Sequence, residues 1–204
     1  MNKQLLVDFI SFECPRDVIL EAIRDPYKAL IVKGVLQRAG SKNQNGRVYP
    51  RDILIRESKK YEENFIRERR ALGELDHPES SVVNLQNVSH NIVEMHWEND
   101  DLVGTIEILP TPNGNILKEL FRSNIRLGIS SRGLGTVQKN IREDVDVVQD
   151  DFELIAFDFV SNPSTRGAFM FLQTRLSEGV TKNPITSKWE KTEDIIRDIL
   201  TEMN

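Results

Sequence analysis

The alternation of apolar and polar positions predicts a chain made mostly of short β-strands with a few helices between them. Runs rich in apolar residues, typical of strands, occupy residues 29–36, 102–109 and 152–160. A longer run at residues 50–70 spaces its apolar residues near the helical period, with many charged residues between them, and predicts an amphipathic helix. We therefore expect an α+β fold class in which antiparallel strands dominate.

The middle of the chain is expected to form a hairpin, a short helix and then a serine-containing bend. Residues 85–109 predict a β-hairpin with its turn at 99–101, and His90 and His96 share one face of its first strand. Asn115 is expected to cap a short helix that ends near Gly128. The chain then enters Gly128-Ile129-Ser130-Ser131-Arg132-Gly133-Leu134-Gly135, whose three glycines predict a bend between strands.

The charge, the cysteine content and the lengths of the apolar runs exclude several classes of function. The chain has 204 residues with 27 Lys and Arg against 32 Asp and Glu, so its formal charge of 27 − 32 = −5 argues against a nucleic-acid binder. The single cysteine, Cys14, allows no internal disulfide. No apolar run is long enough to span a bilayer, and Asp8 interrupts the N-terminal apolar stretch too early for a signal peptide. We expect a cytoplasmic protein that binds neither nucleic acid nor a membrane.

The residue types needed for serine hydrolase chemistry are all present. Ser130 directly follows apolar Ile129 at the expected bend, where its hydroxyl could point into a cleft and act as a nucleophile. His77 precedes a proline, which favours a stiff extended segment, and it is the better base. No histidine follows Ser130, so the third member must be a carboxylate; Asp158, inside an apolar strand, is the first candidate and Glu153 the second.

Other interpretations of these residues remain open. The serine segment taken alone is also what a surface turn looks like, since Gly and Ser are common in turns. Glu74, Asp76 and His77 could bind a metal with a hairpin histidine, although their spacing matches no compact metal motif. His90 and His96 are equally explained by packing or exposure, and Cys14 has no nearby base and is expected to be inert.

Four motifs together resemble a known family, the prohead proteases of tailed bacteriophages, and most closely the T-even type. The motifs occur in the family's order and spacing within residues 29–172; they are Asn43-Gln44-Asn45-Gly46-Arg47-Val48-Tyr49-Pro50, Gly73-Glu74-Leu75-Asp76-His77-Pro78, Ser130-Ser131-Arg132-Gly133-Leu134-Gly135, and Asp158-Phe159-Val160 with Asn162-Pro163-Ser164. The resemblance implies a mostly antiparallel β-barrel surrounded by helices, as in the herpesvirus capsid-maturation protease. We expect neither a metal nor a cofactor.

The resemblance assigns residue roles and a biological setting. It places the nucleophile at Ser130, the base at His77 and the acid at Asp158, where herpesvirus relatives use a second histidine. The oxyanion and substrate loops would include four residues, Ser131, Arg132, Arg166 and Gly167. The enzyme would act in the host cytoplasm inside the immature procapsid, where scaffold or core proteins and the major capsid protein are its substrates. A homo-oligomer is possible within this setting.

The resemblance further implies cleavage after Glu in Leu/Ile-x-Glu sequences, and the chain contains such a site itself. Leu176-Ser177-Glu178 precedes Gly179, so we expect self-cleavage between Glu178 and Gly179. Residues 1–176 would form the protease domain, 177–188 a linker and 189–204 an amphipathic helical tail that is removed. The alternative is a non-catalytic procapsid component that has this fold and binds scaffold through the tail.

Overall fold

The computed structural model describes residues 3–12, 30–76, 78, 80–123, 125 and 127–161; for residues 9–12 it describes the backbone alone. These residues form three β-sheets, two α-helices and a π-helical turn. Most strand pairs are antiparallel, which confirms the predicted α+β class. None of the helices in this part of the chain is long and apolar enough to cross a membrane.

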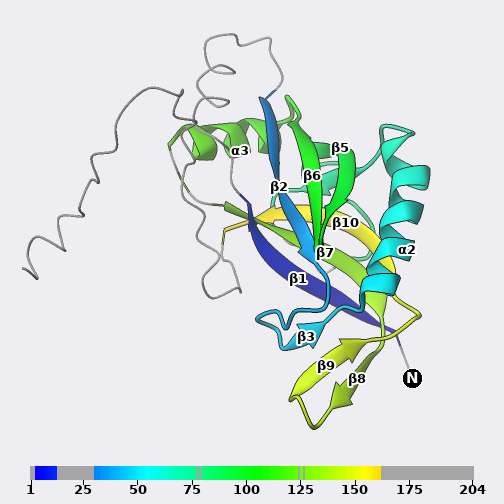
Figure 1. Ribbon diagram of the computed structural model, residues 1–204. Coiled ribbons are helices and arrows are strands. Elements are labelled where there is room, and N and C mark those ends of the chain that lie inside the picture. The colour runs from blue at the N-terminus through cyan, green and yellow to red at the C-terminus, as the bar shows by residue number, and fades with distance from the viewer. Residues whose placement is uncertain are drawn as a thin grey trace, which may run out of the picture. The chain divides into compact units, whose positions relative to one another are not determined.

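The first sheet carries the candidate site. It has the order β1 (Gln4–Phe12), β7 (Leu127–Gly135) and β10 (Glu153–Val160), so β7 lies between two antiparallel neighbours (Figure 1). The predicted bend at Ser130 is wrong, because β7 runs through this serine without interruption. Its glycines serve packing instead: a Cβ on Gly133 would lie 2.4 Å from a ring carbon of Phe152, and one on Gly135 would lie 3.0 Å from the Phe152 Cα.

The second sheet contains the predicted hairpin. Its order is β2 (Leu30–Arg38), β6 (Asp101–Ile108), β5 (Val88–Glu98) and β4 (Leu72–Glu74). A bulge between Ile92 and Glu94 adds one residue to β5 and reverses the facing of the residues after it. His90 is therefore fully buried while His96 is exposed, and the expectation that they share a face is wrong.

The third sheet is small, and the three sheets do not close into one barrel. It pairs β3 (Arg47–Val48) in parallel with β9 (Val145–Val148), which pairs antiparallel with β8 (Val137–Asn140). A single parallel bridge between Leu75 and Phe159 connects the edges of the first two sheets. The closed barrel is thus not found among the described residues, and the likeness to the herpesvirus protease stays a prediction.

The helices agree with the apolar periodicity, with two corrections: the short helix has a different cap from the one expected, and it ends at Arg122 rather than near Gly128. The predicted long helix is α2 (Arg51–Tyr61) followed by the π-helical turn η1 (Glu62–Ile66). The short helix is α3 (Pro112–Arg122), and its cap is Thr111, whose Oγ1 accepts the Gly114 N–H at 3.0 Å. The expected cap at Asn115 is wrong, and this residue lies inside the helix. The helix begins earlier because Pro112 is well suited to the first helical position.

The core packs against the face of the first sheet that carries Phe157 and Phe159. The ring of Tyr61 from α2 meets Phe157 edge-on at 5.7 Å, and Phe121 from α3 meets Phe159 at 5.6 Å. These contacts fix β10, and with it Asp158, between the two helices. The predicted linker at 177–188 and tail at 189–204 lie outside the described residues, so the domain boundaries stay predictions.

Candidate functional site

Ser130 and Asp158 lie directly opposite each other on neighbouring strands. The register of β7 and β10 pairs them, and both side chains are fully buried. Directly paired residues of antiparallel strands place their side chains on the same face. Ser131 points to the other face, where its partner Phe157 belongs to the core. The register therefore distinguishes the two serines: Ser130 shares a face with the Asp158 carboxylate, whereas Ser131 is paired on β1 with Asp8.

His77 lies outside the described residues, but the backbone leading to it is described. Leu75 bridges Phe159 in parallel, and the Asp76 N–H donates to the Phe159 carbonyl oxygen at 2.7 Å. Asp76 has a φ of 69°, the left-handed conformation that a non-glycine residue adopts at some cost. The chain segment that carries the histidine thus passes next to β10 one residue from Asp158.

A buried charge cluster surrounds the Asp158 carboxylate. Arg132 contacts Asp158 through Nε at 3.0 Å and Nη2 at 3.1 Å, and contacts Glu74 through Nη2 at 3.0 Å. The Glu74 backbone N–H also donates to Asp158 Oδ1 at 3.0 Å, and Arg132 Nη1 donates to the Ser80 carbonyl at 2.7 Å. All three charged side chains are fully buried, so one guanidinium compensates two carboxylates.

This cluster changes the interpretation of Arg132. The resemblance placed this residue in an oxyanion or substrate loop, but it lies within β7 and its guanidinium is already bound to two carboxylates. Glu153, the second candidate for the triad acid, lies at the start of β10 and binds exposed Lys3 at 2.6 Å. Of the two acids, Asp158 is the one paired with Ser130.

The two serine hydroxyls converge on one backbone carbonyl. Ser130 Oγ donates to the Asp8 oxygen at 3.0 Å, and Ser131 Oγ donates to the same oxygen at 3.3 Å from the opposite face. The Asp8 carboxylate is itself buried and held by four side chains: Asn43 at 2.6 Å, Asn45 at 2.9 Å, Arg47 at 3.3 Å and the Tyr49 hydroxyl. The motif at residues 43–49 thus holds β1 at Asp8, the residue whose backbone oxygen accepts from both serine hydroxyls.

Sequence reasoning assigned no role to Asp8. The signal that could have revealed it is an acid in an apolar strand, the same signal that singled out Asp158. Burial, together with the neighbouring Asp8 charge, raises the pKa of Tyr49 well above its ordinary value, so its hydroxyl remains a donor to this carboxylate.

The two hairpin histidines have structural explanations. His90 contacts the Phe157 carbonyl through Nε2 and Ser89 Oγ through Nδ1, both at 2.9 Å. Burial lowers the pKa of His90 to about 4, so the ring is neutral near pH 7. His96 is exposed and contacts Glu98 at 2.9 Å. Within the described residues, no group of three or more His, Cys, Asp or Glu side chains could hold a metal ion.

Several predicted residues cannot be placed. Arg166 and Gly167 of the second loop, the cleavage residues Glu178 and Gly179, and Cys14 all lie outside the described residues. What the structure brings together is a serine hydroxyl, a buried carboxylate on the same sheet face, and the segment that leads to a histidine. A nucleophile, a base and a group that orients the base are the requirements of acyl transfer by serine.

Comparisons with known proteins show which family this chain resembles. Residues 21–178 match the family described as prohead core protein serine protease. The chain is 31% identical over 146 residues to the prohead core protein protease of Enterobacteria phage T4, covering 69% of this chain and 68% of that protein. The solved structure of the bacteriophage T4 capsid assembly protease, gp21, matches with a TM-score of 0.68 and 27% identity, covering 78% of this chain and 99% of the other.

Proposed function

This chain belongs to the prohead core protein serine protease family, and from that membership we propose that it is a serine endopeptidase acting inside the phage procapsid. Ser130 is the nucleophile, His77 the general base and Asp158 the acid that orients the base. The observation that carries the proposal is the pairing of Ser130 with Asp158 on adjacent strands, one residue from where the His77 segment meets β10.

The mechanism follows from these roles. His77 removes the proton of Ser130 as the Oγ attacks the carbonyl carbon of the scissile bond, and later donates that proton to the leaving amine. Asp158 accepts from the His77 ring and stabilises the imidazolium, while Arg132 and the Glu74 N–H hold the carboxylate in place. Backbone N–H groups, including those of the segment around Arg166 and Gly167, stabilise the oxyanion, and one good donor contributes roughly 3–4 kcal/mol.

The substrates are the scaffold or core proteins and the major capsid protein, cut after Glu in Leu/Ile-x-Glu sequences. The chain also cuts itself between Glu178 and Gly179, which removes the tail. The full burial of Ser130 supports a precursor form, since the Oγ must become accessible before a peptide can be attacked.

Intact mass measurement tests the self-cleavage. The wild-type chain and Ser130→Ala are incubated under the same conditions, and both masses are followed with time. We expect a wild-type product that lacks residues 179–204 and no such product from the variant. A wild-type chain that stays whole while it cleaves core protein would contradict the proposed processing site, and one that cleaves nothing would contradict the endopeptidase.

One observation favours a second candidate function, a non-catalytic procapsid component that binds scaffold. Ser130 is fully buried and donates to a backbone carbonyl, as a purely structural serine would. Cleavage of purified core protein separates the two functions, because a binding component retains the core protein without shortening it. The His77→Ala variant is the control. If the chain is an enzyme, this variant still binds core protein but no longer cleaves it; if the chain is a binding component, the variant behaves like the wild type.

A further inference from the structure

Glu74 is a second buried carboxylate beside the acid of the candidate site. Its side chain and that of Asp158 are both fully buried, and both contact the Arg132 guanidinium. Glu74 Oε1 accepts from Arg132 Nη2 and from the Asn84 N–H, each at 3.0 Å, and both partners are donors, as an ionised carboxylate requires. Glu74 Oε2 is buried and has no hydrogen-bond partner among the described residues. Burial of such an oxygen is unfavourable, so a carboxylate at this position needs a reason.

The guanidinium taken alone would cancel the charge of Asp158. Arg132 contacts Asp158 through both Nε and Nη2, the two-point contact that pairs arginine most strongly with a carboxylate. In the proposed mechanism the Asp158 charge stabilises the imidazolium that forms on His77, and a cation bound this closely opposes that effect. Glu74 supplies a second negative charge at the same Nη2. The three buried side chains of the cluster therefore carry one net negative charge.

Two further titratable side chains are close enough to the Asp158 charge for their pKa values to respond, and both are neutral near pH 7. Burial, together with the Asp158 charge, raises the pKa of Tyr61 from α2. Burial lowers the pKa of His90 from β5 to about 4, and the Asp158 charge opposes this only in part. Neither side chain changes the net charge of the cluster. A proton on His77 brings the sum to zero, and this is the protonation state that the ring reaches as the nucleophile attacks.

Two independent contacts fix Glu74 relative to Asp158. Glu74 is the last residue of β4, and its backbone N–H donates to Asp158 Oδ1 at 3.0 Å. Its side chain reaches the same carboxylate through the shared guanidinium of Arg132. The Asp76 N–H then donates to the Phe159 carbonyl oxygen at 2.7 Å, which holds the following residues of this segment against β10. The second charge is thus placed by the same backbone that leads to the base.

We propose that Glu74 is a positioning residue of the endopeptidase, whose carboxylate holds the Arg132 guanidinium and restores the negative charge that favours a protonated His77 in the transition state. The inference rests on the proposed endopeptidase function and adds a fourth residue to the three named there. The substitution Glu74→Gln isolates this role. Glutamine keeps the oxygen that accepts from Arg132 and Asn84, and its amide nitrogen replaces only the other oxygen.

The first test follows cleavage of a fluorogenic peptide, with the sequence of residues 171–184 of this chain, as a function of pH. We expect Glu74→Gln to lower kcat about tenfold, to change KM less than about twofold, and to move the acid limb of the kcat/KM profile about one pH unit lower. Glu74→Asp retains the charge and should retain the wild-type acid limb. If Glu74→Gln does not fold, Glu74→Met removes the same charge without burying an amide. An unchanged acid limb in the folded uncharged variant, or an equal shift in Glu74→Asp, overturns the inference.

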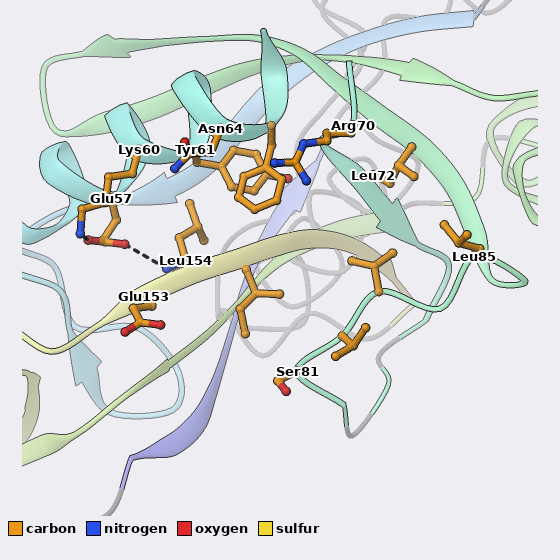
Figure 2. Close-up of a pocket in the computed structure, with 14 residues that line it drawn as sticks. Glu57, Lys60, Tyr61, Asn64, Arg70, Leu72, Ser81, Leu85, Glu153 and Leu154 are labelled. Carbon is orange, nitrogen blue, oxygen red and sulfur yellow. Dashed lines mark hydrogen bonds and ion pairs between the residues drawn. The ribbon is translucent and has the colours of Figure 1, made fainter. Parts of the chain in front are cut away.

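The matched control is Glu57→Gln, which removes the charge of another buried carboxylate that holds the same strand. Glu57 Oε2 accepts the Leu154 N–H at 3.3 Å near the start of β10, and Lys60 contacts Oε1 at 2.8 Å (Figure 2). This substitution weakens a contact of β10 but leaves the charge of the cluster unchanged. It should lower stability while kcat and the acid limb stay as in the wild type. An equal loss of kcat with an equal shift in Glu57→Gln would show a purely structural effect and overturn the inference.

Nuclear magnetic resonance separates failure of this inference from failure of the proposed function. The titration of the His77 ring is recorded on Ser130→Ala protein, with and without Glu74→Gln, and it requires no cleavage. The chain has three histidines, so replacing each in turn assigns the ring signals. A His77 midpoint about one pH unit lower in the double variant supports the inference even if the wild type cleaves nothing. The same midpoint in both proteins overturns it, even if the wild type is an active protease.

Discussion

Replacement of Arg132 by methionine is expected to destabilise the protein severely, although the substitution preserves most of the side-chain volume. The arginine is fully buried and contacts two fully buried carboxylates, Glu74 and Asp158, each at 3.0 Å. Its loss leaves both carboxylates uncompensated, and Glu74 Oε2 already has no hydrogen-bond partner among the described residues. Breaking a buried ion pair by removing one partner costs about 3–5 kcal/mol, and we expect a loss of that size in the free energy of unfolding.

Urea unfolding followed by circular dichroism measures this loss. The matched control is Arg122→Met, which removes an exposed ion pair with Glu119 at 2.7 Å and should cost less than about 0.5 kcal/mol. Adding Glu74→Gln to Arg132→Met should recover about 1 kcal/mol or more, because one unpaired buried charge is removed. A loss below about 1 kcal/mol in Arg132→Met would refute the view that this guanidinium compensates the carboxylates of the site.

Three further predictions test the surroundings of the site. Because burial lowers the pKa of His90 from 6.5 to about 4, the unfolded chain takes up a proton that the folded chain does not, and stability falls as pH drops from 6.5 towards 4. Urea unfolding of wild type and His90→Gln measures this effect. Between pH 7 and pH 4 the free energy of unfolding of the variant should rise by about 3 kcal/mol relative to that of the wild type. A difference between the two that does not change with pH would contradict the prediction. Asp8→Asn weakens the four hydrogen bonds to a buried carboxylate, so thermal unfolding should report a loss of about 2 kcal/mol; an unchanged Tm would show that the cluster does not stabilise β1. Gly73→Ala places a Cβ 2.2 Å from His90 Nε2, and this overpacking should lower the free energy of unfolding by on the order of 3 kcal/mol. If urea unfolding shows almost no change, the two sheets separate easily at this position.

Local patterns were sufficient to predict most of the secondary structure. The hairpin of β5 and β6 and the long helix α2 are confirmed, because period-two and helical spacing of apolar residues report directly on which side is buried. The bend at Ser130 was wrong for a different reason. Glycines permit a turn, but the glycine at position 133 instead makes room for the Phe152 ring, and no local pattern distinguishes these uses.

The candidate site was predicted in its residue types but not in its contacts. A serine, a histidine before proline and an acid in an apolar strand are visible in the sequence. The buried cluster of Arg132 with Glu74 depends on the register of three strands far apart in the chain, and so does the meeting of both serine hydroxyls at Asp8. Such long-range pairings are set by tertiary packing, which single-sequence periodicity does not contain.

The most direct test of the account is covalent labelling of Ser130 by a fluorophosphonate, located by peptide mass spectrometry. The full chain and the form lacking residues 179–204 are both labelled, since Ser130 is fully buried in the full chain. We predict labelling at Ser130 of the shortened form, and a loss of at least about three orders of magnitude in labelling rate in His77→Ala, because triad members act as a unit. Absence of label at Ser130 in folded, shortened protein, or equally fast labelling of His77→Ala, would contradict the serine mechanism.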